Sequence, residues 1–300
     1  MDTKQKAYLE LSVAMVIVGS SVVVGKLLVG SFPIFLANAL SLAISSLILL
    51  VLLLRQEKGI PAISRQQGLL LLWQALTGVF LFRVLLFCGL KFTTALESGI
   101  ITSTTPAVIG LISFFFLKER LNWKTSTGIG LSVLGIITIS VLGTSLETAS
   151  GTNPLLGNVL IFGAVVSEAL FTIFAKAASI KAKPLITCTS ASVFGLLMFL
   201  PIALHEARTF NFSSVDLIDW LPILYYGIVV SVIAYILWFQ GVSKVPANVA
   251  GVFSGILPIS AIVFSYVILR ERFLWLHLGG VLCILLAIGL ITIDSHEAKG

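Results

Sequence analysis

Charged residues are scarce in this sequence. They make up 11% of its 300 residues, against about 25% in an ordinary soluble domain, and hydrophobic residues make up 58%. A water-soluble protein of this length needs polar side chains over its surface, and these are too few to cover it. The scarcity excludes a cytosolic enzyme, a secreted disulfide scaffold and a nucleic-acid-binding protein, and it predicts a chain embedded in lipid. The net charge of +6 then reflects Lys and Arg kept on cytoplasmic loops.

Cysteine and histidine are nearly missing, with three residues of each. Cys88, Cys188 and Cys283 are far apart in the chain, each inside an apolar run, without the paired spacing of a disulfide or metal site. Phosphate-binding loops, zinc helices and nucleophile elbows are also missing from the sequence. We therefore predict no catalytic residue, no metal, no cofactor and no enzymatic activity.

Apolar runs of membrane-crossing length fill the chain. About 20 apolar residues are needed to cross the hydrocarbon of a bilayer as a helix. Short breaks separate the runs, and nothing remains for a soluble domain. The sequence predicts ten spans, in order 7–27, 34–54, 68–90, 95–117, 124–143, 155–175, 186–204, 218–239, 246–268 and 274–294.

The basic residues predict the orientation of these spans. An even number of spans places both termini on one side of the membrane. Thirteen of the 19 Lys and Arg residues fall on that side and five on the other, while Arg83 lies inside span three. Positive charge is retained in the cytoplasm, so both termini are expected there. The short loops favour the bacterial inner (plasma) membrane.

The two halves of the chain repeat each other. Shifting the sequence by 152 residues aligns Phe87–Ile139 with Phe239–Ile291 without a gap. Leu and Ile identities count for little in apolar sequence, but the rarer residues also coincide: Pro106 with Pro258, Glu119-Arg120 with Glu271-Arg272, and Trp123 with Trp275.

Each half, residues 1–150 and 151–300, contains five predicted spans. Because five is odd, the second half must cross the membrane in the opposite sense to the first. The predicted fold is therefore an all-α polytopic membrane protein with ten transmembrane helices, built as two inverted-topology repeats of five. Inverted repeats occur in secondary transporters, in which two halves rock around a site near the midplane.

The paired motifs carry a family resemblance that covers the whole chain. The chain resembles the drug/metabolite transporter superfamily in its ten-span EamA-type form. That resemblance implies an exporter of small metabolites, amino acids among them, although relatives carry nucleotide sugars or triose phosphates. It specifies the fold well and the substrate poorly. The motifs are Pro106, Leu117-Lys118-Glu119-Arg120 and Gly128, and Pro258, Leu269-Arg270-Glu271-Arg272 and Gly280.

Two prolines interrupt spans four and nine at equivalent positions. Pro106 and Pro258 follow stretches with small residues at every fourth position, which allow helices to pack closely in lipid. A proline in a membrane helix frees a backbone carbonyl and makes a kink or hinge. Tight packing alone explains the small residues equally well, but we expect hinges that let the two halves rock.

Three charged residues lie inside predicted spans, where charge is costly and functional by default. Arg83 in span three and Glu97 in span four lie at similar depth, so they can form a pair that does no more than neutralise itself. Glu168 in span six lies deeper, eight residues from Lys176. We expect Glu168 to be the group that binds a proton or an ammonium.

Polar and aromatic side chains line one face of span eight, where Ser231, Tyr235 and Trp238 recur at helical spacing. Such stripes often serve packing, but unpaired hydroxyls are costly in a membrane. We predict a central cavity between spans one, three, four, six, eight and nine, with apolar walls and few charges. It would suit neutral or zwitterionic solutes better than phosphorylated ones. The further polar residues expected on the pathway are Ser98, Thr102 and Ser254.

The sequence thus predicts a monomeric secondary transporter that exports amino acids, mainly large apolar or aromatic ones, or related metabolites, by alternating access. Its partners would be a small-molecule substrate, membrane lipid and, if transport is coupled, protons. One alternative is a broad multidrug or cation extruder with proton exchange, which needs an essential deep carboxylate. A second alternative is a membrane receptor that transports nothing.

Overall fold

The computed structural model describes residues 3–57, 63–102, 104–116, 153–179 and 182–270, together with a few isolated positions beyond 122 and 277. Every regular element in these ranges is helical, which confirms the predicted all-helical class. The predicted spans five, 124–143, and ten, 274–294, lie almost wholly outside the described residues.

Six stretches of the described chain are long and apolar enough to cross a membrane. They coincide with the predicted spans one, two, three, six, seven and eight. Their outer faces carry large apolar side chains such as Leu47, Leu155 and Leu197, as expected of helices that face lipid. The stretches are Thr3–Ser31, Ile34–Gln56, Arg65–Phe92, Pro154–Ala178, Pro184–Thr209 and Leu217–Lys244.

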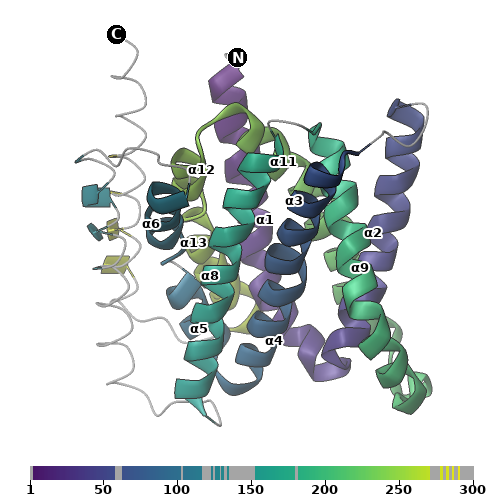
Figure 1. The fold of residues 1–300 in the computed structure, drawn as a ribbon. Coiled ribbons are helices and arrows are strands. Elements are labelled where there is room, and N and C mark those ends of the chain that lie inside the picture. The colour runs from purple at the N-terminus through teal and green to yellow at the C-terminus, as the bar shows by residue number, and fades with distance from the viewer. Residues whose placement is uncertain are drawn as a thin grey trace.

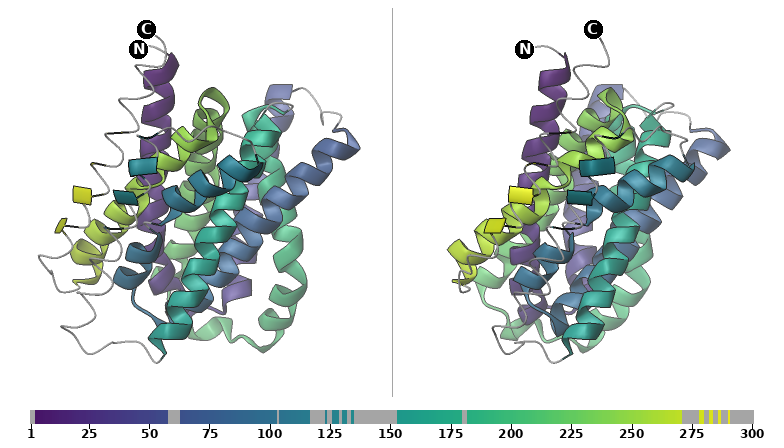
Figure 2. Two further views of the ribbon diagram at one scale, coloured as in Figure 1. Left: turned by 60° about the vertical axis from the view of Figure 1, so that its left-hand side comes forward. Right: turned by 90° about the vertical axis from the view of Figure 1, so that its left-hand side faces the viewer.

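Four of the six spans are single helices. They are α1 (Thr3–Ser31), α2 (Ile34–Glu57), α8 (Pro154–Ser179) and α9 (Pro184–Thr209). The proline that opens α8 and α9 lacks the N–H that the first helical turn leaves without an intrahelical partner, so it begins a helix at little cost. Helix α1 runs the full height of the bundle, and α2 and α9 pack side by side along one flank (Figures 1 and 2).

Spans three and eight are composite, and each contains a π-helical segment. Span three consists of α3 (Arg65–Ala75), η1 (Leu76–Leu81) and α4 (Phe82–Phe92). Span eight follows the short 3₁₀ turns η2 (Phe212–Ser214) and η3 (Leu217–Asp219) and consists of α10 (Trp220–Leu224), η4 (Tyr225–Ala234) and α11 (Tyr235–Lys244). A shift of 152 residues places η1 within η4, so the π-helical segments occupy equivalent positions in the two spans. Such segments are frequent at functional sites.

Spans four and nine are broken near their middles. Span four divides into α5 (Ala95–Thr102) and α6 (Thr105–Phe116), and span nine into α12 (Ala247–Phe253) and α13 (Ile256–Phe264), which continues as η5 (Ser265–Leu269). The breaks fall two to four residues before Pro106 and Pro258, as expected because proline has no N–H for the carbonyl four residues earlier. Hinge motion at these breaks remains a prediction.

The helices that surround the centre pack as two groups. Helix α1 packs against η4, α11 and α13, which we call the α1 group. Helix α8 packs against η1, α4 and α6, which we call the α8 group. Under the shift that aligns the two halves of the sequence, each group is the counterpart of the other. The groups therefore face each other across a seam at the centre of the molecule.

Helices α1 and α13 approach each other closely at Gly19. The Ser260 hydroxyl donates a hydrogen bond across this contact to the Val16 carbonyl, at 2.7 Å. A Cβ added at Gly19 would overlap the Leu257 carbonyl and lie 2.6 Å from the Ser260 Cβ. Since a backbone carbonyl cannot move aside cheaply, only glycine fits at this position.

We expect Gly19→Ala to destabilise the protein by about 1–3 kcal/mol, the usual cost of overpacking a close contact. Gly30, on the same helix, has no atom within 4 Å of an added Cβ. Gly30→Ala is therefore the matched control and should be neutral or slightly stabilising. Thermal unfolding in detergent, followed by circular dichroism, measures both variants, and equal melting temperatures would contradict the close approach.

Candidate functional site

A small cavity lies in the seam between the α1 group and the α8 group. Its walls come from α1, from η1 and α4, from α8, and from η4 and α11, which are predicted spans one, three, six and eight. Its volume is about 50 Å³, room for a few water molecules. Among the described residues, spans four and nine contribute nothing to its lining, contrary to the expected six-span wall.

Arg83 is the cation of this cavity. It is the second residue of α4, the last α-helical part of span three, and only 3% of its surface is exposed. Its Nη1 donates to the Asn38 Oδ1 at 3.2 Å and to the Ser41 hydroxyl at 3.3 Å. Its Nη2 donates to the Ser231 hydroxyl at 2.6 Å, and the guanidinium lies 5.6 Å from the centre of the Tyr226 ring. The charge is therefore held by α2, α4 and η4 together.

Glu168 is the anion of the same cavity. It lies near the middle of α8 with 8% of its surface exposed, and its Oε2 accepts a hydrogen bond from the Thr105 hydroxyl at 3.1 Å. Thr105 is the first residue after the break in span four. The carboxylate thus links the cavity to the broken helix, and two of the three predicted intramembrane charges, Arg83 and Glu168, line this cavity.

Aromatic side chains form the rest of the wall. Phe171 of α8 lies 6.3 Å from Tyr235 and 5.6 Å from Phe239, ring centre to ring centre, so the two helix groups meet through tilted and edge-on rings. Trp238 also lines the cavity, and its buried Nε1 donates to no acceptor among the described residues. A buried N–H without an acceptor costs free energy, which an acceptor on a bound molecule would recover.

The structure separates the other predicted residues from this cavity. The expected Arg83–Glu97 ion pair is wrong. The Glu97 carboxylate instead accepts a hydrogen bond from the hydroxyl of Thr93, which follows the last residue of α4. The same hydroxyl oxygen lies 3.0 Å from the Asn158 Oδ1 of α8. The reason is geometric: Arg83 points toward α2 and η4, while Glu97 opens the short helix α5.

Two of the predicted pathway hydroxyls bond within their own helices. The Ser98 hydroxyl donates to the Thr94 carbonyl at 2.8 Å, and the Ser254 hydroxyl donates to the Gly251 carbonyl at 2.5 Å. Thr102, like these two, is buried and does not line the cavity. Ser254 and Thr102 lie at the two helix breaks, so they border the expected hinges.

Sequence reasoning missed Asn38, Ser41 and Tyr226. Asn38 is an amide inside the apolar run of span two, which is a usable signal because such a group in lipid needs a partner. Its partner, Arg83, could not be identified without the packing of α2 against α4. Ser41 and Tyr226 carry no comparable signal in an apolar sequence.

Two lysines, also missed, bind helix ends in matching ways. Lys26 of α1 donates to the carbonyls of Leu90 and Thr93 at the end of α4, at 2.6 and 2.8 Å. Lys176 of α8 donates to the carbonyls of Val242 and Val245 at the end of α11, at 3.2 and 2.7 Å. The carbonyls differ by 152 residues in both cases, and the lysines by 150.

The described chain forms a bundle of membrane-crossing helices around a small central cavity, and the sequence comparison identifies the family. The model of the EamA-like transporter family matches residues 5–141 and again residues 155–293. The chain therefore belongs to the EamA-like transporter family, which confirms the resemblance seen in the paired motifs. It is a multi-pass membrane protein of a transporter family.

The relatives share this description. The chain is 47% identical over 291 residues to "Uncharacterized transporter YetK" of Bacillus subtilis (strain 168), covering 97% of this chain and 88% of that one. It is 24% identical to "Uncharacterized transporter YyaM" of the same strain, covering 96% and 97%. A solved crystal structure aligns with a TM-score of 0.74 at 18% identity, covering 95% of this chain and 98% of the other, and supports the fold alone.

We expect Ser231→Ala to destabilise the protein because it leaves the buried Arg83 guanidinium short of its nearest acceptor. The expected loss is about 1.5–3 kcal/mol, typical of a hydrogen bond to a charged group. Ser45→Ala is the matched control, since Ser45 is also fully buried but its hydroxyl donates to the Leu42 carbonyl of its own helix. Urea or thermal unfolding in detergent compares the two variants, and an equal loss in both would remove the special role of Ser231.

Proposed function

We propose that this protein is a secondary transporter that exports amino acids, above all those with large apolar or aromatic side chains, or closely related metabolites. The observation that carries the proposal is the presence of both Arg83 and Glu168 in the wall of one small cavity. The other lining residues that the proposal uses are apolar or aromatic, namely Phe171, Tyr235 and Trp238.

The cavity complements a zwitterion with an apolar side chain. A guanidinium with its planar donors suits a carboxylate, and a carboxylate suits an ammonium. The Trp238 indole N–H is available as a further donor. A neutral apolar molecule would leave both charges without compensation, and a phosphorylated one would require more than one cation. An amino acid with an apolar side chain would complement the guanidinium, the carboxylate and the apolar wall at once.

Alternating access is the proposed mechanism. Residues 1–150 and 151–300 would form two inverted repeats of five spans, ten in total. The support is the double match of the family model, the π-helical segments in spans three and eight, and the mutual packing of the α1 and α8 groups. The breaks before Pro106 and Pro258 would serve as the hinges on which the groups rock.

The volume of the cavity fits an occluded state. At about 50 Å³ it is far below the range of about 300–1,000 Å³ that is usual for ligand pockets. An amino acid can enter only if the α1 group and the α8 group separate at one end. The distribution of Lys and Arg supports a cell inner membrane location with both termini in the cytoplasm. The central seam lies within a single chain, so a monomer suffices.

A cation extruder with proton exchange is the second candidate, and the buried Glu168 carboxylate favours it. Such a transporter would bind an organic cation and a proton alternately at this group. It would have no use for Arg83 in the cavity wall, because a cation there repels a cationic substrate. The presence of both charges therefore favours the zwitterion.

Counterflow in proteoliposomes tests the zwitterion directly. Vesicles loaded with unlabelled phenylalanine should accumulate labelled phenylalanine. Phenethylamine, which lacks the carboxylate, and 3-phenylpropionate, which lacks the amine, should each compete at least about tenfold less well, because each loses a charge-assisted hydrogen bond. Equal competition by phenethylamine would instead support the cation extruder, and counterflow of no amino acid would overturn the proposal.

Replacing the carboxylate separates binding from coupling. We expect Glu168→Gln to lower phenylalanine counterflow at least about tenfold, because the amide cannot pair with an ammonium. Glu10→Gln is the control, since Glu10 is a buried carboxylate of α1 that pairs with Lys244 outside the cavity. If flux driven by a pH gradient in the wild type is also lost in Glu168→Gln, protons are coupled through this residue. Near-normal counterflow would remove Glu168 from the site.

A further inference from the structure

Lys26 and Lys176 make the same contact at opposite ends of the molecule. Each extends from a long helix and donates to two carbonyls at the end of a neighbouring helix, Leu90 and Thr93 for Lys26, and Val242 and Val245 for Lys176. The last carbonyls of a helix have no intrahelical donor, and they carry the negative end of the helix dipole. A lysine ammonium is well suited to cap them.

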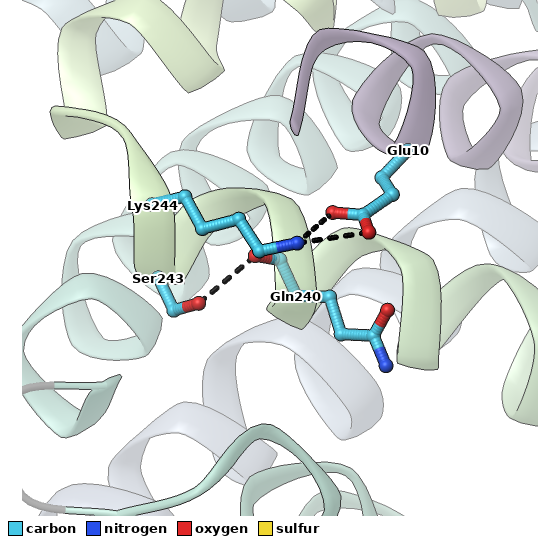
Figure 3. A network of polar contacts seen from close by, with 4 residues as sticks. All are labelled: Glu10, Gln240, Ser243 and Lys244. Atoms are coloured by element: carbon cyan, nitrogen blue, oxygen red, sulfur yellow. Dashed lines mark hydrogen bonds and ion pairs between the residues drawn. The ribbon is translucent and has the colours of Figure 1, made fainter. Parts of the chain in front are cut away.

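The two contacts lie far apart along the seam. Val242 and Val245 flank Lys244, which pairs with Glu10 near the start of α1, with its Nζ 2.6 Å from the Glu10 Oε2 (Figure 3). Lys26 lies 16 residues further along α1, a rise of about 24 Å. In Figure 1, α4 accordingly descends to the lower end of the bundle, while α11 lies at the upper end.

Both lysines cross the seam between the two groups. Lys26 belongs to the α1 group and binds the end of α4 in the α8 group. Lys176 belongs to the α8 group and binds the end of α11 in the α1 group. The Glu10–Lys244 ion pair differs in this respect, because α1 and α11 belong to the same group. The seam is therefore closed on both sides of the cavity by one lysine at each end.

We propose that Lys26 and Lys176 are paired latches of the transport cycle. Lys26 holds one end of the seam closed and Lys176 the other, and the cycle releases one latch at a time while the second stays bound. The proposal rests on the proposed transport function, and it adds two positioning residues that touch no substrate. With both latches bound, as here, the cavity has a volume of only about 50 Å³.

The chemistry of the latch makes release reversible. When one end of the seam opens, water reaches the lysine and the helix-end carbonyls together, and hydrates both. Exchange of these hydrogen bonds for bonds to water changes the free energy only modestly. At a closed end water does not reach the lysine. Its release would leave two buried carbonyls without a donor, which costs free energy. Each latch thus sets the balance between closed and open at its own end.

Lys26→Met and Lys176→Met remove the donors while keeping most of the side-chain volume. Each variant should favour opening at its own end by about tenfold, and so trap the transporter in one state and slow counterflow. Lys26→Arg and Lys176→Arg keep a cationic donor and should restore most of the flux. Glu10→Gln is the matched control, because it breaks a pair within one group and should leave the balance between the ends unchanged.

The decisive variant combines both substitutions. If the lysines are opposed latches, the double variant loosens both ends equally and should transport faster than either single variant. If they only stabilise the fold, the double variant should be less stable and slower than both. Thermal unfolding of all variants separates a loss of fold from a shift of balance.

Spin-label distances measure the opening without any substrate. In a chain whose three cysteines are replaced by serine, nitroxides on Leu27→Cys and Lys91→Cys report the Lys26 end. Nitroxides on Ala177→Cys and Ser243→Cys, the equivalent positions, report the Lys176 end. In nanodiscs, Lys26→Met should lengthen the first distance alone and Lys176→Met the second alone. Lengthening of both distances by either variant, or of neither, would overturn the latches.

The two readouts also separate the latches from the proposed function. If each Met variant lengthens only the distance at its own end, but the protein moves no amino acid, the latch proposal is supported and the amino-acid substrate is refuted. Wild-type counterflow with a double variant slower than both single variants would leave the function standing and refute the latches.

Discussion

The rest of the structure depends on the burial of one guanidinium. A cation inside a bilayer is tolerated only if it finds polar partners, and Asn38, Ser41 and Ser231 accept from three of the five N–H donors of Arg83. Those acceptors come from α2 and η4, so the charge fixes where two other spans lie relative to α4. The same arrangement leaves the guanidinium in the wall of the central cavity, which the carboxylate of Glu168 also lines. The Arg83 guanidinium thus both determines how the helices pack and forms part of the proposed binding surface.

Backbone groups impose the second constraint. In lipid every N–H and C=O must be satisfied inside the protein, so broken helices occur only where protein surrounds them. Both breaks, in spans four and nine, pack against other helices of the bundle. The ends of α4 and α11 meet the same requirement through the ammonium groups of Lys26 and Lys176. The breaks and the lysine-capped helix ends therefore lie where other described helices surround them.

The sequence predicted those features that depend only on neighbouring residues in the chain. The apolar runs predicted the spans, the matched prolines predicted the interruptions, and the positions of Arg83 and Glu168 inside those runs predicted polar sites. Partners were beyond reach, because they depend on how helices pack: Arg83 was expected to pair with Glu97 and instead bonds to Asn38 on a different span. The lysine contacts were hidden for another reason. Lys26 and Lys176 differ by 150 residues, whereas the repeat was aligned at 152.

The central claim is that the cavity between the two groups holds the substrate, and Trp238 in its wall can report it. In a chain with Phe in place of Trp73, Trp123, Trp220 and Trp275, the emission of the remaining indole should change saturably when leucine, which does not fluoresce, is added. Arg83→Met should abolish the change, because the carboxylate of leucine then has no cation to bind. No response of Trp238 in protein that transports leucine would place the substrate elsewhere and contradict the claim.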